Sequence, residues 1–136
     1  MVKLMRTIGR LFAPLVFWIA YALFRSPFAK SSKGRHDFVM KLFRYAADHR
    51  NRRALSVYGH LLHFRGDGIQ NRIQGAIYLQ QAADMGDMKS QYQMGKVFEQ
   101  GFEGYFQIDD VKARQYYSLA ARQGHPLALT KLEEGV

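Results

Sequence analysis

The sequence predicts an all-α protein, a short α/α solenoid of about two and a half helix-pair repeats that follows an N-terminal hydrophobic helix. Ala-Ala pairs recur at 46–47, 82–83 and 120–121, so that the spacings are 36 and 38 residues. A period of this length with two helical segments per unit is typical of α/α solenoids. A further observation, the uncharged run at 11–24, predicts the hydrophobic helix.

Residues 1–34 are expected to form a basic and apolar segment, which anchors the chain in a membrane or docks on protein, followed by a linker. As a helix, the run 11–24 spans about 21 Å, which is short of the ~30 Å hydrocarbon core of a bilayer. A membrane span, a helix in the lipid interface and a helix buried on protein all remain open. The residues expected to contact membrane or protein are Arg10, Leu11, Phe12, Leu15, Val16, Phe17, Trp18, Ile19, Tyr21, Leu23, Phe24 and Arg25.

The same segment also resembles a secretory signal peptide, because a basic start precedes a short apolar core. The stretch that follows, "FRSPFAKSS" at 24–32, offers no clean small-x-small cleavage site, and Pro27 is poorly placed for cleavage. Retention of the segment is therefore the expectation. The positive-inside rule does not orient it, since basic residues lie on both sides of the apolar run.

The solenoid domain is expected at 35–136. Its parts are a degenerate unit at 36–51, a unit at 52–87, a unit at 88–125 and a terminal helix at 126–135. Helices are expected at about 37–49, 53–65, 72–84, 88–100, 110–122 and 126–134. Small residues at Ala54, Ser90 and Ala128 recur in the first helix of each unit and let neighbouring helices approach closely. Gly86 and Gly124 follow the second helices, where a C-cap favours a left-handed residue.

The degenerate unit has only its second helix. "FVMKLFRYAAD" at 38–48 ends in Ala-Ala-Asp, like "YLQQAAD" at 78–84, and its first helix would fall at about 18–29, on the apolar segment. A solenoid unit cannot bury its apolar face without a neighbour. We therefore expect the N-terminal helix, or a helix of a partner, to cover the apolar face of 38–48.

Two stretches resemble the Sel-one-like repeat, a relative of the tetratricopeptide repeats: "QYQMGKVFEQG" at 91–101 and "DDVKARQYYSLAARQG" at 109–124. The pattern of that family falls on Ser90, Met94, Gly95, Phe98, Gly101, Lys112, Ala113, Tyr116, Tyr117, Ala120, Ala121 and Gly124. The unit at 54–86 departs from it, because "HFRGDG" has one residue more before the glycines and Gln74-Gly75 replaces Lys-Ala. The resemblance covers about 46–135 and implies a solenoid that serves as an adaptor or assembly factor, usually without catalysis.

The formal net charge of +9 is unevenly distributed. Residues 1–75 carry 14 Lys and Arg against 3 Asp and Glu, whereas residues 76–136 carry 6 against 8. A basic N-terminal part suggests an acidic surface nearby, and anionic lipid, an acidic protein and nucleic acid all offer one. Anionic lipid is the expected partner there. Nucleic acid is not expected, because the aromatic residues fall on repeat core positions and not on a base-stacking face.

No constellation of residues predicts catalysis. The chain has no cysteine, which excludes a thiol nucleophile and a thiolate metal site. His60 and His63 stand at i, i+3, but no acidic residue near them in sequence completes a metal site. The adjacent acids Asp109-Asp110 and Glu133-Glu134 do not face each other on a helix. We therefore expect no catalytic, cofactor-binding or metal-binding residue and no small-molecule substrate.

The polar face of the first helices is expected to bind another protein through Arg53, His60, His63, Gln93, Lys96 and Gln100. Together with the N-terminal segment, this face predicts a non-enzymatic, membrane-tethered adaptor for protein–protein interaction. Such a protein would be an accessory or assembly subunit of a bacterial membrane or envelope complex, located at the bacterial inner membrane. The alternative is an exported, soluble periplasmic regulator that signal cleavage releases.

Overall fold

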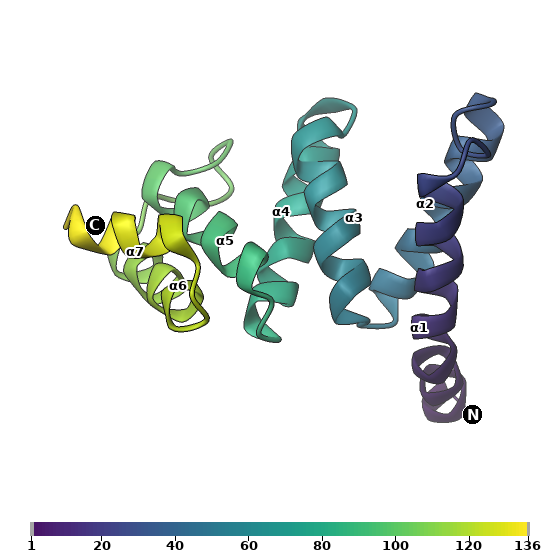
Figure 1. Ribbon diagram of the computed structural model, residues 1–136, viewed down its shortest axis with the longest axis horizontal. Coiled ribbons are helices and arrows are strands. Elements are labelled where there is room, and N and C mark those ends of the chain that lie inside the picture. The colour runs from purple at the N-terminus through teal and green to yellow at the C-terminus, as the bar shows by residue number, and fades with distance from the viewer. Residues whose placement is uncertain (1, 136) are drawn as a thin grey trace. The chain divides into compact units, whose positions relative to one another are not determined.

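The computed structural model describes residues 2–135, which form seven α-helices and, apart from an isolated bridge between Phe102 and Phe106, no β-structure. In chain order the helices are α1 (Val2–Arg25), α2 (Lys33–Asp48), α3 (Arg52–Arg65), α4 (Gly68–Asp84), α5 (Met88–Gln100), α6 (Asp110–Arg122) and α7 (Pro126–Glu133) (Figure 1). The predicted all-α fold with an N-terminal hydrophobic helix is confirmed. The chain consists of two compact units: an N-terminal unit that ends at Tyr58 and a C-terminal unit that begins at Gly59.

In the N-terminal unit, α1 packs along α2. The rings of Phe17 and Phe24 on α1 both lie 5.9 Å, centroid to centroid, from the ring of Phe43 on α2. Phe43 is fully buried as a result. Helix α1 therefore covers the apolar face of 38–48, as expected, but it spans Val2–Arg25 and not the 18–29 expected for the missing first helix.

Small residues on α1 let the two helices of the N-terminal unit approach closely. The buried positions of α1 are Gly9, Ala13, Phe17 and Ala20, which follow one another at helical spacing. A Cβ atom built on Gly9 would lie 2.0 Å from Cδ2 of His49, the C-cap residue that follows α2. The contact thus extends from Gly9, beside the end of α2, to Phe24, beside the Phe43 ring.

Two helices begin four residues earlier than predicted. Helix α2 begins at Lys33 because the Ser32 hydroxyl caps it and accepts a hydrogen bond from the Arg35 backbone N–H at 3.2 Å. Helix α4 begins at Gly68, and the Asn71 side chain donates to the Asp67 carbonyl across its first turn. The other starts and all the ends of α2 to α7 agree with the prediction to within one residue, whereas α1 begins at Val2, well before the apolar run at 11–24.

The core of the C-terminal unit lies between α4, α5, α6 and α7. Its buried members are Ala76, Leu79, Ala83, Met94, Val97, Phe98, Phe106, Ala113, Tyr117, Ala120 and Ala128. The Ala-Ala pairs at 82–83 and 120–121 each contribute a residue to this core, which is why they recur at a fixed spacing. Gly86 and Gly124 follow their helices with φ angles of 97° and 93°, in the left-handed region that was predicted.

Candidate interaction surfaces

Two of the six residues predicted to bind a partner are buried in the C-terminal unit. His63 and Gln93 are only 6% and 9% exposed. The His63 Nε2 atom lies 3.2 Å from Gln93 Nε2, and its Nδ1 atom lies 3.3 Å from the Arg72 carbonyl oxygen. Since an amide nitrogen donates, His63 accepts at Nε2 and donates from Nδ1, as a neutral imidazole does. Burial lowers the pKa of His63 below its ordinary value and favours this neutral form.

The other four predicted residues lie at or near the surface. His60 is half-buried and its ring stacks on that of Phe64. Lys96 is half-buried, with Nζ 6.0 Å from the centroid of the Tyr92 ring, and Gln100 is exposed at the end of α5. Arg53 belongs to the N-terminal unit instead, where its guanidinium lies 5.1 Å from the centroid of the Trp18 ring. His60, Lys96 and Gln100 are therefore the predicted residues that offer surface on the C-terminal unit.

The histidine pair on α3 does not assemble a metal centre. Among residues 2–135, no group of three or more His, Asp or Glu side chains is placed to hold a metal ion. The His63 ring is bonded to Gln93 and Arg72, which occupies both of its nitrogen atoms. The i, i+3 spacing of the histidines therefore reflects a structural role for the second of them.

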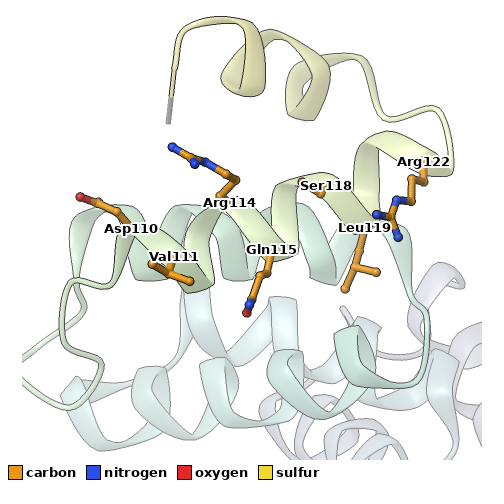
Figure 2. Close-up of a pocket in the computed structure, with 7 residues that line it drawn as sticks. All are labelled: Asp110, Val111, Arg114, Gln115, Ser118, Leu119 and Arg122. Atoms are coloured by element: carbon orange, nitrogen blue, oxygen red, sulfur yellow. The ribbon is translucent and has the colours of Figure 1, made fainter.

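Sequence reasoning missed a pocket of about 560 Å³ on the outer face of α6. Figure 2 shows three of its residues, Val111, Gln115 and Leu119, in line along the helix. Val111 is 69% exposed and Leu119 is 39% exposed, although both are apolar. Arg114 and Arg122 also line the pocket. The available signal was the pair of apolar residues Val111 and Leu119, eight positions apart on one face of the helix and outside the repeat pattern.

A second hollow, between α4 and α6, shares Gln115 and Leu119 with this pocket. The Tyr116 hydroxyl lines it and donates to the Asp84 carboxylate at 2.7 Å. Burial and this hydrogen bond raise the pKa of Tyr116 to about 12, so that the phenol stays protonated near neutral pH. The outer face of α6 therefore presents a continuous surface of apolar, basic and hydroxyl groups.

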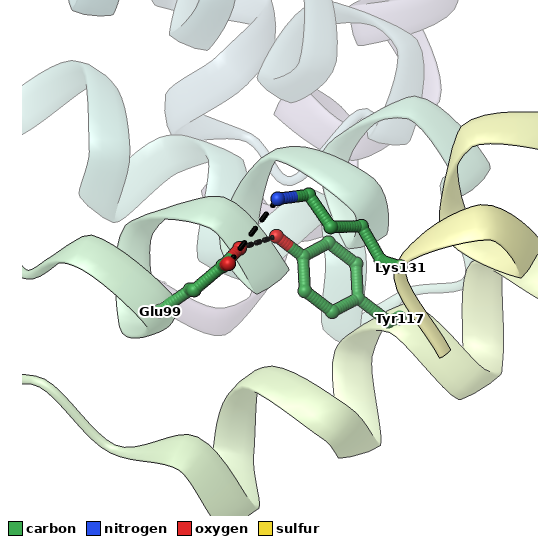
Figure 3. Close-up of polar contacts among 3 residues, drawn as sticks. All are labelled: Glu99, Tyr117 and Lys131. Atoms are coloured by element: carbon green, nitrogen blue, oxygen red, sulfur yellow. Dashed lines mark hydrogen bonds and ion pairs between the residues drawn. The ribbon is translucent and has the colours of Figure 1, made fainter. Parts of the chain in front are cut away.

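A cluster of three charged and polar groups joins α5, α6 and α7 (Figure 3). The Tyr117 hydroxyl donates to the Glu99 carboxylate, and Lys131 Nζ lies 3.2 Å from Glu99 Oε1. Burial alone would raise the pKa of Glu99, but the hydrogen bonds from Tyr117 and Lys131 more than offset it and lower that pKa. The Glu99 carboxylate thus accepts hydrogen bonds from both other groups, and these bonds attach the terminal helix α7 to the repeat before it.

The residues predicted to contact membrane or protein divide between two faces of α1. Phe17 is buried against α2, and four more are half-buried: Val16, Tyr21, Leu23 and Phe24. The exposed ones are Arg10, Leu11, Phe12, Leu15, Trp18, Ile19 and Arg25. Val2–Arg25 is long and apolar enough to cross a membrane, and only 22% of its most apolar stretch is buried. That helix therefore exposes most of its large apolar side chains, although a signal sequence would satisfy the same test of length and composition.

Comparisons with known proteins agree with the repeat geometry. The model of the Sel1 repeat family matches residues 53–87 and 89–125. Among solved structures, a Sel1 repeat protein from Oxalobacter formigenes is similar with a TM-score of 0.69. The similarity covers 98% of this chain and 99% of that chain at 22% sequence identity, which establishes a shared fold. No curated protein matches this chain.

Proposed function

The chain belongs to the Sel1 repeat family, and from this membership we propose that it is a non-enzymatic adaptor that binds another protein through its repeats. Sel1 repeats imply protein–protein interaction, and the family is generally a non-catalytic scaffold. The observation that carries the proposal is the presence of two such repeats, at 53–87 and 89–125. Repeat arrays of this kind bind partners on the surface that successive repeats build.

We propose that the partner contacts α3 and α5 through His60, Lys96 and Gln100. Lys96 and Gln100 lie one helical turn apart on α5, and Gln100 is exposed. His63 and Gln93 support this surface from beneath, because their hydrogen bond joins α3 to α5. The outer face of α6 is a second candidate, which its pocket and the exposed Val111 and Leu119 favour.

We further propose that α1 tethers the adaptor to a membrane, as an accessory or assembly subunit of a bacterial membrane or envelope complex. The exposed apolar side chains of α1 and the basic residues around them support this tether. Release of a soluble regulator by signal cleavage is disfavoured, because removal of α1 would uncover Phe43, which is fully buried against Phe17 and Phe24.

Site-specific photocrosslinking in living cells tests the adaptor. A photoreactive amino acid is placed at Gln100 on α5, at Gln115 on α6, or at the exposed Gln81 on α4 as the matched control. We expect one defined adduct from Gln100 that is absent from Gln81. An adduct only from Gln115 would move the partner to the outer face of α6. The absence of adducts at all positions would contradict the adaptor.

Membrane fractionation tests the tether separately. Membranes are washed with high salt and then with carbonate, and the retained protein is examined by intact mass. We expect a full-length chain that stays with the membranes through the salt wash. A mass that lacks the N-terminal segment, with the protein in the soluble fraction, would support the exported regulator instead.

A further inference from the structure

Helix α1 has a face of large apolar side chains that the N-terminal unit leaves uncovered. These exposed residues are Leu4, Ile8, Leu11, Phe12, Leu15, Trp18 and Ile19. At 3.6 residues per turn, the centre of this apolar stripe lies roughly 150° around the helix from the face that packs on α2. The stripe and α2 therefore lie on nearly opposite sides of α1.

The basic residues of α1 lie on a side of the helix away from the apolar stripe. Helix α1 contains no acidic residue, and Lys3, Arg6 and Arg10 are exposed along a third face. Residues 1–58 carry 12 Lys and Arg but only 2 Asp. Trp18 and Tyr21 add aromatic rings of the kind that gather at a membrane surface. A helix with an apolar stripe on one side and a basic face on the other is typical of helices that lie in the interface of an anionic bilayer.

The packing of α2 on α1 opposes a transmembrane arrangement. Because Gly9 lies beside His49 and Phe24 lies beside Phe43, the second half of α2 runs alongside the apolar run of α1. Three charged residues of that half, Lys41, Arg44 and Asp48, are exposed. If α1 crossed the bilayer with α2 attached, these charges would enter the hydrocarbon core, which is costly.

If α1 separated from α2 in order to cross the bilayer alone, the charges of α2 could stay in water, but the packing between the two helices would be lost. Phe43 is fully buried, and its ring lies against the rings of Phe17 and Phe24 on α1, so that separation of the helices would remove these contacts. If the stripe lies in lipid and α2 lies on the water side, the apolar side chains of α1 contact acyl chains. The charged side chains of α2 then stay in water, and the α1–α2 contact is kept. In that orientation the basic face of α1 also points away from the hydrocarbon, where arginine side chains reach the phosphate groups.

We propose that α1 lies flat in the surface of a bilayer rich in anionic phospholipid, with its apolar stripe in the acyl boundary and α2 on the water side. This inference rests on the membrane tether proposed above and specifies its lipid class and depth. The occupant of the stripe is lipid, as the surplus of positive charge on the same helix and in the rest of residues 1–58 indicates.

Trp18 is the only tryptophan of the chain and reports the depth of α1 without labelling. The full-length protein is added to vesicles of phosphatidylcholine alone, or of phosphatidylcholine mixed with phosphatidylglycerol. We expect a blue shift of Trp18 emission only with phosphatidylglycerol. Added salt should reduce the shift without abolishing it, because salt screens charge but leaves the apolar stripe in the acyl boundary. Lipids brominated near the headgroup should quench this emission more than lipids brominated at the chain end.

Single-cysteine variants distinguish a flat helix from a span, since the chain has no cysteine of its own. Lys3→Cys and Lys30→Cys lie before and after the apolar run, and Lys41→Cys lies on α2. The protein is added to the outside of sealed vesicles and then treated with an impermeant maleimide. We expect all three cysteines to react. Protection of only one of the first two would mean a span, which overturns this inference and leaves the tether intact.

A substitution on the stripe tests its role directly. Leu15 is 57% exposed, so that Leu15→Glu leaves the α1–α2 contact intact, and circular dichroism confirms that the helices remain. We expect vesicle binding to fall roughly tenfold or more. Gln81→Glu, a change of equal charge at an exposed position of the C-terminal unit, is the matched control and should bind as the parent does. If the parent binds neither vesicle, both the tether and the flat helix fail. Protection of Leu15→Cys from maleimide in the absence of lipid would instead mean that protein covers the stripe.

Discussion

The ring of Tyr117 on α6 fills the space that a side chain at Gly95 on α5 would need. A Cβ atom at position 95 would lie 2.5 Å from both Cδ1 and Cε1 of Tyr117, far inside van der Waals contact. Tyr117 is fully buried, and close-packed neighbours surround it. The repeat therefore needs glycine after Met94 so that the two helices can approach.

Gly95→Ala should lower the free energy of unfolding by about 1–3 kcal/mol, because the added methyl group forces α5 and α6 apart. Urea denaturation of the full-length protein measures the loss. Gly34→Ala is the matched control, since a Cβ atom at that position on α2 meets nothing within 4 Å. The control should leave stability unchanged or raise it slightly. Equal stability of the two variants would contradict the close approach.

Tyr117→Phe should destabilise the C-terminal unit by about 1.5–3 kcal/mol, the range for a hydrogen bond to a charged group. The ring keeps its place, so that only the bond to the Glu99 carboxylate is lost. Tyr105→Phe is the control, because Tyr105 is 59% exposed. Thermal unfolding of both variants measures the difference. A loss no larger than that of the control would mean that the bond to Glu99 does not stabilise the fold.

The repeat positions could be predicted from sequence, whereas the contacts between repeats could not. Ala83, Ala120 and Gly124 follow from local rules, since close helix packing needs small residues and a left-handed cap needs glycine. The periodicity of α3 placed His63 on a polar face. In the structure the Phe102 ring, from the loop after α5, lies 4.6 Å from the His63 ring. Helical periodicity does not specify how such a loop folds over a neighbouring repeat.

The Glu99 cluster shows the same limit. Lys131 reaches Glu99 from 32 residues further along the chain, through the terminal helix. The acid and the base are both ordinary surface residues by their sequence pattern. Only the stacking of α7 on the previous helix pair brings them together, and that geometry depends on the complete core.

The C-terminal unit should lose stability as pH falls below about 4.5, the ordinary pKa of a glutamate. Folding lowers the pKa of Glu99, so that its stabilising effect is present above the ordinary value and disappears as pH falls through the lowered one. Urea denaturation across the acid range measures this dependence. Glu99→Gln should be less stable at neutral pH and should lose less further stability on acidification. Parallel pH curves for the two proteins would contradict the role of the cluster.

Phe43→Ala should destabilise the N-terminal unit by about 3–5 kcal/mol, because it removes the ring that both Phe17 and Phe24 contact. Loss of this contact frees α1, so that trypsin should cut the full-length protein after Arg25 much faster than in the parent. Phe38→Ala is the matched control, since Phe38 lies on the same helix but is 49% exposed. Its cleavage rate should stay close to that of the parent. If both variants are cut at the same rate, α1 is not held by α2, and α1 is then free to cross a membrane alone. If only Phe43→Ala is cut faster, the two helices form one body, and any membrane that receives α1 must also accommodate the charges of α2.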